Sequence, residues 1–467
     1  MNFKTILQSL RSKDMLKRIA IIFGIIIAYR LLAHIPVPLG DASTFKDAVN
    51  NLITSTDFGG FLNLISGGGL TSFSIILVGL SPFITASIVI QLLTKAIPRM
   101  EELHKDGESG RRKINQWTRM LAVPLAILQS IAYIFILYQQ VLATNTTVAV
   151  EPSAIQWILS ITAMSAGSIL LMWLGELITE QGIGNGTSMI IFASIISSFP
   201  ATLASIGTSL FDTSAGSLSL FGWFDLPVNP NTFFIVLGFA VGIIIVLYFL
   251  VKVNEAQRIV TINYAKRVHG NSAYGGIKSI MPIKLIAAGV VPVIFAVAFL
   301  SLPAFIGQIM LSANPDNQVA SNLVAWFSAP SASNFNGLTP EWFIYPICYF
   351  ILVVAFTFFY TSIIFNTKEI AENLQKQGGF IEGVRPGLET EKYFNRTVRR
   401  LNLFGALALG LIAMLPYITD YIFIVVAGAP IGLSLSGTGL LIVVTVALES
   451  LRQLNSRALM VTYDEYK

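Results

Sequence analysis

The sequence predicts an all-α integral membrane protein with ten transmembrane helices, and three observations support this fold class. Hydrophobic residues make up 54% of the 467-residue chain, charged residues make up 12%, and the mean hydropathy is +0.71. A soluble domain carries about 25% charged residues. Ten apolar stretches recur along the chain, and twenty-eight of the thirty Lys and Arg residues lie in alternate gaps between them.

The apolar stretches define the predicted helices. Most have the roughly 20 residues that a helix needs to cross a ~30 Å hydrocarbon layer, and the tenth is shorter at its cytoplasmic end. The first has no small-residue cleavage site and nine further spans follow it, so we expect a retained helix. The predicted spans are Ile19–Ile35, Phe73–Leu93, Met120–Val141, Ile155–Leu177, Thr187–Ile206, Phe233–Val251, Leu285–Phe305, Phe343–Phe365, Leu401–Ile418 and Gly437–Leu448.

The basic residues orient these spans. Lys and Arg are retained on the cytoplasmic side of a membrane. The intervening gaps hold almost no base apart from Lys46, and Arg30 lies inside the first span. Both termini are therefore predicted to be cytoplasmic. The basic segments are Met1–Arg18, Thr94–Arg119, Lys252–Lys284, Asn366–Arg400 and Arg452–Lys467.

The ten spans divide into an N-terminal half, residues 1–206, and a C-terminal half, residues 233–451. Residues 207–232 form a base-free external connection, and residues 452–467 form a cytoplasmic tail. Because each half has an odd number of spans, the two halves must have opposite orientations in the membrane. Inverted repeats of this kind place a pathway at the interface between the halves. The repeat is inferred from topology alone, since the halves share no evident sequence similarity.

Two cytoplasmic segments are longer than a turn requires. Residues 252–284 carry six bases and residues 366–400 carry seven. The retention of bases on the cytoplasmic side is one explanation. A docking surface for a large acidic or phosphate-rich partner is the other, because clustered bases steer such partners. The length of the segments favours the docking surface.

A third unusual segment is Gly59–Thr71, which is half apolar, too short to span, and ends in a run of glycines. A re-entrant element of this type is tolerated where it is buried in protein or lines a cavity. An external loop with a glycine-rich turn is the alternative.

No pattern for chemical catalysis is evident. The chain has no phosphate-binding loop of the Gly-x4-Gly-Lys-Ser/Thr type, and Gly182–Gly186 predicts a turn into the fifth helix rather than a dinucleotide fingerprint. Its one cysteine is Cys348, and its three histidines lie in separate segments, which predicts no disulfide and no metal site. We therefore expect neither an enzyme nor a cofactor.

Ion coupling is also disfavoured. Ionisable residues within a bilayer are costly and mark ion pathways, yet the span interiors hold no charge except Arg30. Glu176 and Glu449 are expected at cytoplasmic helix ends, where water reaches them. Main-chain and hydroxyl sites keep a secondary transporter open as an alternative, and an intramembrane enzyme is a third reading that no residue set supports.

Seven short segments, in order from the first half of the chain to the last span, carry a family resemblance. They are Phe61–Gly69, Pro82–Leu93, Gly182–Ala193, Asn263–Arg267, Gly289–Ala296, Val384–Gly387 and Gly437–Val444. In residues, order and spacing they resemble the SecY family, in its bacterial or organellar form. The resemblance covers nearly the whole chain and favours a channel over the alternatives.

The resemblance implies a protein-conducting channel with its two halves around a central hourglass pore. Unfolded secretory preproteins would cross the plasma (inner) membrane through it. Hydrophobic segments would leave sideways into lipid through a lateral gate between the second and seventh spans. The pore waist would be a ring of apolar side chains, which can exclude water and ions by dewetting. By resemblance the ring is Ile84, Ile88, Ile191, Ile195, Ile294 and Ile442.

The same resemblance assigns a plug and a docking surface. The plug would lie near residues 59–71. Its hinge would be the run Gly67–Gly69, because glycine permits backbone conformations that other residues resist. Implied partners are the small membrane subunits SecE and SecG, the SecA motor ATPase, a translating ribosome, signal peptides, nascent preproteins, lipid and, as an alternative to a monomer, a second copy of the chain. Two departures from the family pattern are Glu382, where proline is usual, and Ser436–Gly439. The implied plug and hinge residues are Phe61, Leu62, Leu64, Ile65, Gly67, Gly68 and Gly69, and the docking residues are Arg258, Lys266, Arg267 and Arg385.

Overall fold

The computed structural model describes residues 13–38, 73–144, 153–211, 218–220, 224–226, 230–264, 267–269, 272–274, 278–286, 288–289, 291–314, 316–328, 341–427 and 437–465. Within these ranges the chain is mostly helical, as the sequence predicts. The helices are α2 (Lys13–Leu32), α5 (Ser81–Ala96), α6 (Pro98–Lys105), α7 (Glu108–Thr144), α8 (Ala154–Gln181), α9 (Gly186–Leu210), α10 (Pro230–Glu255), α11 (Val291–Ala313), α12 (Gln318–Phe327), α13 (Glu341–Ile364), α14 (Thr367–Lys376), α15 (Leu388–Ala427) and α16 (Gly437–Glu465).

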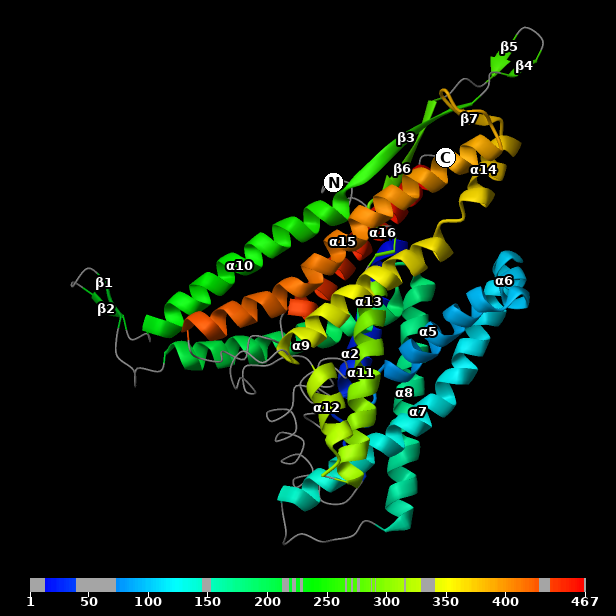
Figure 1. Cartoon of the computed structure of the whole chain (residues 1–467). Helices are drawn as coiled ribbons and strands as arrows, with labels where there is room; N and C mark the ends of the chain where they lie inside the picture. The colour runs from blue at the N-terminus through cyan, green and yellow to red at the C-terminus, as the bar shows by residue number, and fades with distance from the viewer. Residues whose placement is uncertain are drawn as a thin grey trace.

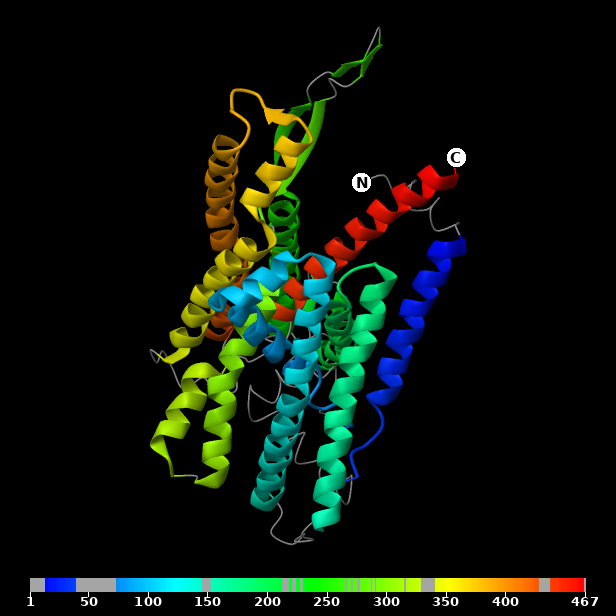
Figure 2. The same ribbon diagram turned by 90° about the vertical axis from the view of Figure 1, so that its right-hand side faces the viewer.

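The helices pack in two groups. The first contains α2, α5, α7, α8 and α9, and the second contains α10, α11, α13, α15 and α16. The groups meet where α5 and α7 contact α11, and where α9 contacts α10 and α16. The C-terminal end of α7 and the N-terminal end of α8 lie at one end of the molecule in both views. Helix α14 and a small sheet, described below, lie at the opposite end (Figures 1 and 2).

Each of the ten predicted spans coincides over most of its length with one helix of the structure. Fewer of these helices are both long enough and apolar enough to cross a membrane by themselves. Six helices in the described part of the chain are long and apolar enough to cross a membrane. A seventh is counted if α5 and α6 are joined across a bend of 105°. The sequence of α6, Pro-Arg-Met-Glu-Glu-Leu-His-Lys, is polar and lies in a basic segment, so we place α6 outside the membrane. The number of ten spans stays a prediction.

Two helices begin later than the sequence predicts. The second span was expected from Phe73, but residues 73–80 form turns and α5 begins at Ser81. The seventh was expected from Leu285, but α11 begins at Val291. In both helices proline is the second residue, where its missing N–H costs no helical hydrogen bond and its fixed φ favours a helix start. Pro82 and Pro292 therefore begin helices rather than kink them.

The two long segments that the sequence predicts to be cytoplasmic contribute strands to one sheet. Strands β3 and β6 pair over seven residues, and β7 pairs with the end of β3, so the strand order is β6-β3-β7. Buried side chains from the sheet, α14 and α15 form its core, including Val260, Ile262 and Phe394. The described parts of the two segments are thus joined through β3 and β7. The strands are β1 (Leu218–Leu220), β2 (Phe224–Leu226), β3 (Gln257–Tyr264), β4 (Arg267–His269), β5 (Ser272–Tyr274), β6 (Lys278–Lys284) and β7 (Gly379–Ile381).

Candidate functional site

The six predicted ring residues come from four helices and lie in one hydrophobic cluster. Ile84 and Ile88 project from α5, Ile191 and Ile195 from α9, Ile294 from α11 and Ile442 from α16. The side chains of Ile84, Ile88 and Ile191 are 6%, 6% and 5% exposed, and the other three are half-buried against the same cluster. These four helices provide contacts between the two groups, α5 with α11 and α9 with α16. The cluster therefore lies at the seam between the groups.

A cavity of about 450 Å³, lined by both apolar and polar side chains, adjoins three of the predicted ring residues. Three ring residues, Ile84, Ile191 and Ile294, line its apolar side. The remaining wall is mainly polar, and its side chains come from α5, α7, α8 and the start of α9. The polar lining comprises Ser87, Gln91, Asn115, Thr118, Arg119, Glu176, Thr179, Glu180, Asn185, Thr187 and Ser188. The cavity thus combines three of the predicted ring isoleucines with a set of polar side chains.

An ion pair spans the wall of this cavity. The Nε of Arg119 on α7 donates to Oε1 of Glu176 on α8 at 2.6 Å. Glu176 was expected at a water-accessible helix end, and its side chain is 23% exposed. The partnership itself was missed, because 57 residues separate the two side chains and no local spacing signals the contact.

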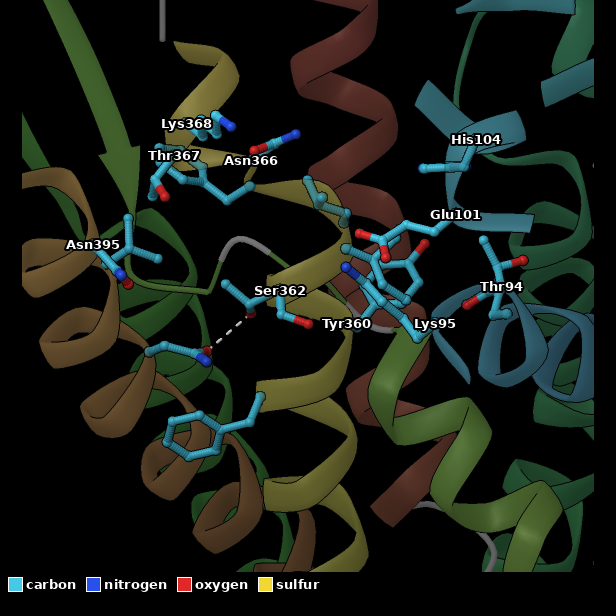
Figure 3. Close-up of a pocket in the computed structure, with 18 of the residues that line it drawn as sticks. Thr94, Lys95, Glu101, His104, Tyr360, Ser362, Asn366, Thr367, Lys368 and Asn395 are labelled. Atoms are coloured by element: carbon cyan, nitrogen blue, oxygen red, sulfur yellow. Dashed lines mark hydrogen bonds between the residues drawn. The ribbon is translucent and has the colours of Figure 1, made fainter. Parts of the chain in front are cut away.

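A second cavity, of about 860 Å³, lies between α5, α6 and α7 of one group and α13, α14 and α15 of the other. Gln91 lines both cavities, so they adjoin. The charged side chains that line the second cavity are mainly basic: Lys95, Arg111, Lys368 and Arg399 are cations, and Glu101 is an anion. Figure 3 shows labelled side chains that face the cavity from both groups: Thr94, Lys95, Glu101 and His104 from α5 and α6, and Ser362, Asn366, Thr367, Lys368 and Asn395 from the segment α13 to α15.

His104 on α6 is a titratable group in the lining of this second cavity. Burial lowers the pKa of His104 from its ordinary value of 6.5, and the nearby Arg111 and Lys95 cations lower it further. Glu101 and Glu369 act in the opposite direction with smaller effect. Because Glu369 belongs to α14, His104 responds to charges from both groups of helices.

Two of the predicted docking residues are exposed at the end of the molecule that carries the β6-β3-β7 sheet. Arg258 lies on β3, and Arg385 lies in the turn between β7 and α15. Positive φ values at Gly383 (78°) and Gly387 (98°) flank this turn. The carbonyl oxygen of Arg385 accepts a hydrogen bond from Oγ1 of Thr390 at 2.9 Å. The backbone of the turn is therefore fixed while the Arg385 side chain faces solvent.

The other predicted residues are not placed. Phe61, Leu62, Leu64, Ile65, Gly67, Gly68 and Gly69, together with Lys266, lie outside the described residues. Arg267 begins β4, and its side chain is outside the description. Among the residues that are described, no group of three His, Cys, Asp or Glu side chains could hold a metal ion.

A family model described as SecY matches residues 74–451. The chain belongs to the SecY family. It is 37% identical over 463 residues to a protein translocase subunit SecY of Streptomyces galbus, with 98% of each chain covered. It is also 37% identical to a protein translocase subunit SecY of Thermus thermophilus, which covers 99% of this chain and 97% of the relative.

Solved structures share the SecY fold of this chain. One, described as a protein conducting channel, aligns with a TM-score of 0.60 and 19% identity over 93% of this chain and 90% of its own. Another, Sec61 in a canine ribosome-channel complex from the endoplasmic reticulum, aligns with a TM-score of 0.56 and 18% identity, again over 93% and 90%. The mainly helical architecture described above is thus that of the SecY and Sec61 channels.

Proposed function

We propose that this SecY family member is the protein-conducting channel of a translocase, and that unfolded preproteins cross the plasma membrane through its isoleucine ring. The observation that carries the proposal is that six isoleucines from four helices belong to the hydrophobic core where the two helix groups meet, and that three of them line one cavity. A hydrophobic constriction dewets and blocks ions. Flexible aliphatic side chains can yield to a passing chain, whereas a fixed polar filter would select small solutes.

We assign the lateral gate to α5 and α11. These helices contact each other, and both contribute ring residues. Their separation would connect the ring to the lipid on that side. Roughly 20 apolar residues of a chain in transit would then partition favourably into the bilayer. A signal peptide would use the same route.

Supporting residues keep the roles that the family resemblance gives them. The segment Gly59–Thr71, outside the described residues, is assigned as the plug, with Gly67–Gly69 as its hinge. Ten spans in two inverted halves with both termini cytoplasmic remain our proposed topology. The proposed partners are SecE, SecG, SecA or a translating ribosome, and lipid.

The exposed arginines of the cytoplasmic surface are proposed to bind the motor or the ribosome. The sheet joins Arg258 of the first long segment to the Arg385 turn of the second. Arginine suits this role, because its planar fork binds carboxylate or phosphate groups in a bidentate manner. Lys266 and Arg267 complete the proposed set.

The test is protease protection of a secretory preprotein in vesicles that contain this chain, SecE, SecG, SecA and ATP. Arg385→Glu should reduce protection, while Arg112→Glu, an equal charge reversal at a 79% exposed side chain of α7, should not. Loss of protection in both variants would remove the docking assignment. Absence of protection with the unaltered chain in correctly oriented vesicles would refute the channel.

A further inference from the structure

Helix α12 follows α11, one of the two proposed gate helices, in a segment that the sequence predicts to be external. Residues 306–342, which contain α12, carry no Lys or Arg. α12 contacts α11 and α13, and both of these helices are long and apolar enough to cross a membrane. In both views α12 lies toward the same end of the molecule as the C-terminal end of α7, away from the β6-β3-β7 sheet (Figures 1 and 2).

One face of α12 packs against the outer part of α11. Ala320 is buried, and Val324 and Phe327 are half-buried. A Cβ on Gly307 of α11 would lie 3.0 Å from Cγ2 of Val324 and 3.1 Å from the carbonyl oxygen of Ala320. This approach of the two helices is close enough to favour glycine, which has no Cβ. α12 and the outer part of α11 therefore pack as one unit.

A second apolar stripe of α12 is exposed. Val319 and Trp326 are 63% and 39% exposed, and the half-buried Leu323 lies between them in the sequence. Spacings of four and three residues place these side chains on one face of the helix. The exposed polar residues Ser321 and Asn322 lie outside this stripe. α12 thus presents more apolar surface than α11 covers.

The exposed stripe continues the apolar surface of the neighbouring helices. Ile306 of α11, next to Gly307, is exposed, as are Phe343 and Ile347 of α13. α12 has no ionisable side chain, so it offers no charge complementarity to a protein partner. Tryptophan is enriched at membrane–water interfaces, and amphipathic helices lie there with their apolar face toward the acyl chains. A lipid interface therefore suits the stripe better than water or a charged protein.

We propose that α12 binds the lipid interface on the external side of the membrane. Val319, Leu323 and Trp326 contact the acyl chains, while Ser321 and Asn322 face the headgroups and water. The partner is the membrane surface itself, that is, the lipid headgroups and the first carbons of their acyl chains.

Resting on the proposed function, this lipid contact anchors the outer end of the gate helix α11. Pro303 lies inside α11, one turn before Gly307. A proline within a helix removes one backbone hydrogen bond and allows a bend. The inner part of α11, which carries Ile294, can therefore move away from α5 while the outer part stays with α12 at the interface.

The first test measures the depth of α12 with nitroxide spin labels. The full chain is assembled with SecE and SecG in vesicles of phosphatidylethanolamine and phosphatidylglycerol. Because Cys348 is the one cysteine of the sequence, a Cys348→Ala background allows single labels at Val319→Cys, at Trp326→Cys and, as the control, at Ser321→Cys. The ratio of collisions with oxygen to collisions with a water-soluble nickel chelate should be higher at 319 and 326 than at 321, because oxygen concentrates in lipid.

Two results of the labelling would overturn the proposal. Equal collision ratios at positions 319 and 321 would place the stripe in water. A label at 319 that neither reagent reaches would mean that protein covers the stripe, whether a small subunit or a second copy of the chain. No transport is needed for these measurements, so failure of the lipid contact is distinguished from failure of the proposed channel.

The second test concerns the anchoring of α11. Val319→Asp places a carboxylate against the acyl chains, which disfavour charge, and should reduce protease protection of a preprotein in the same vesicles with SecA and ATP. Ser321→Asp adds the same charge outside the stripe and should leave protection unchanged. Full protection with Val319→Asp, or an equal loss with Ser321→Asp, would overturn the anchoring role.

Discussion

Shortening one ring isoleucine should make the resting channel leak without unfolding it. We choose Ile88→Ala on α5, where the side chain is 6% exposed. The matched control is Ile134→Ala on α7, a fully buried isoleucine in the second hydrophobic cluster, away from the ring residues. Both substitutions delete the same three carbons from a buried membrane helix. They differ in whether the deleted atoms belong to the proposed constriction.

The expected loss of stability is smaller at the ring than at the control. Three buried carbons at about 0.8 kcal/mol each give about 2.4 kcal/mol of transfer free energy. A rigid cavity adds to this, and buried Ile→Ala substitutions reach about 2–5 kcal/mol. Ile88 does not line the cavity itself, but Ile84, one turn earlier on α5, does. The space left at Ile88 therefore lies next to the cavity and is expected to fill with water, so the cavity contribution shrinks. At Ile134 the surroundings are apolar, and a void there stays empty.

Two measurements on the same preparations separate the outcomes. Thermal unfolding in detergent should show the larger destabilisation for Ile134→Ala. Planar-bilayer conductance at rest should show a leak for Ile88→Ala and none for Ile134→Ala. Only the first substitution removes side-chain atoms from the proposed constriction, which widens it and lets water and ions enter. A sealed Ile88→Ala channel, or an equal leak from Ile134→Ala, would refute the ring assignment.

Three further predictions concern the surroundings of the ring. Gly186→Ala should lower the thermal unfolding midpoint, because its Cβ would lie 1.7 Å from the Gly175 carbonyl oxygen and the α8–α9 packing must shift. Asn402→Ala should destabilise the chain by about 0.5–1.5 kcal/mol in detergent unfolding, since it removes one of two acceptors of the Thr361 hydroxyl, at 2.9 Å, while the Thr357 carbonyl oxygen at 2.7 Å remains. Because burial lowers the pKa of His104, the unfolded chain binds a proton first, so stability should fall as pH drops below about 6.5, and His104→Gln should reduce that fall.

Each of these predictions has an internal comparison. Gly207→Ala places a Cβ where no atom lies within 4 Å, so it should be tolerated where Gly186→Ala is not. Asn395→Ala alters an exposed asparagine of the same helix as Asn402 and should leave the unfolding midpoint unchanged. For His104, unfolding midpoints at pH 5 to 8 that coincide for the variant and the unaltered chain would contradict the burial argument.

The sequence predicted the helical class and the approximate positions of the long helices, because apolar length and the distribution of bases are properties of the linear chain. Helix starts were less predictable. The hydropathy of residues 73–80 is the same whether they form turns or a helix, so it does not show where the helix begins. Pro82, the second residue of α5, marks that start. The same holds for Pro292 in α11.

The candidate site was predictable only in part. Isoleucines of a membrane helix have the same hydropathy whether they face lipid or a pore, so Ile88 and the exposed Val89 cannot be told apart by composition. The family resemblance selected the ring residues, all six belong to the large hydrophobic core, and the ring itself stays a prediction. Contacts between distant segments had no local signal, as with the Arg119–Glu176 pair and the pairing of Ile262 on β3 with Ile381 on β7.

Two of the contacts between the helix groups differ in chemistry: the contact of α5 with α11, and the contact of the turn before α9 with α16. This difference indicates which of the two can open. The α5 and α11 side chains in the ring cluster are apolar, among them Ile84, Ile88, Val293 and Ile294. Lipid tails are as apolar as these side chains, so parting the helices costs little beyond lost packing. Separating the turn between α8 and α9 from α16 would instead leave the Gly184 N–H and the Gln453 amide oxygen without this hydrogen bond in a part-buried site. Since a stranded donor or acceptor costs more than the net value of its hydrogen bond, the apolar contact is the one expected to open toward lipid while the polar contact holds.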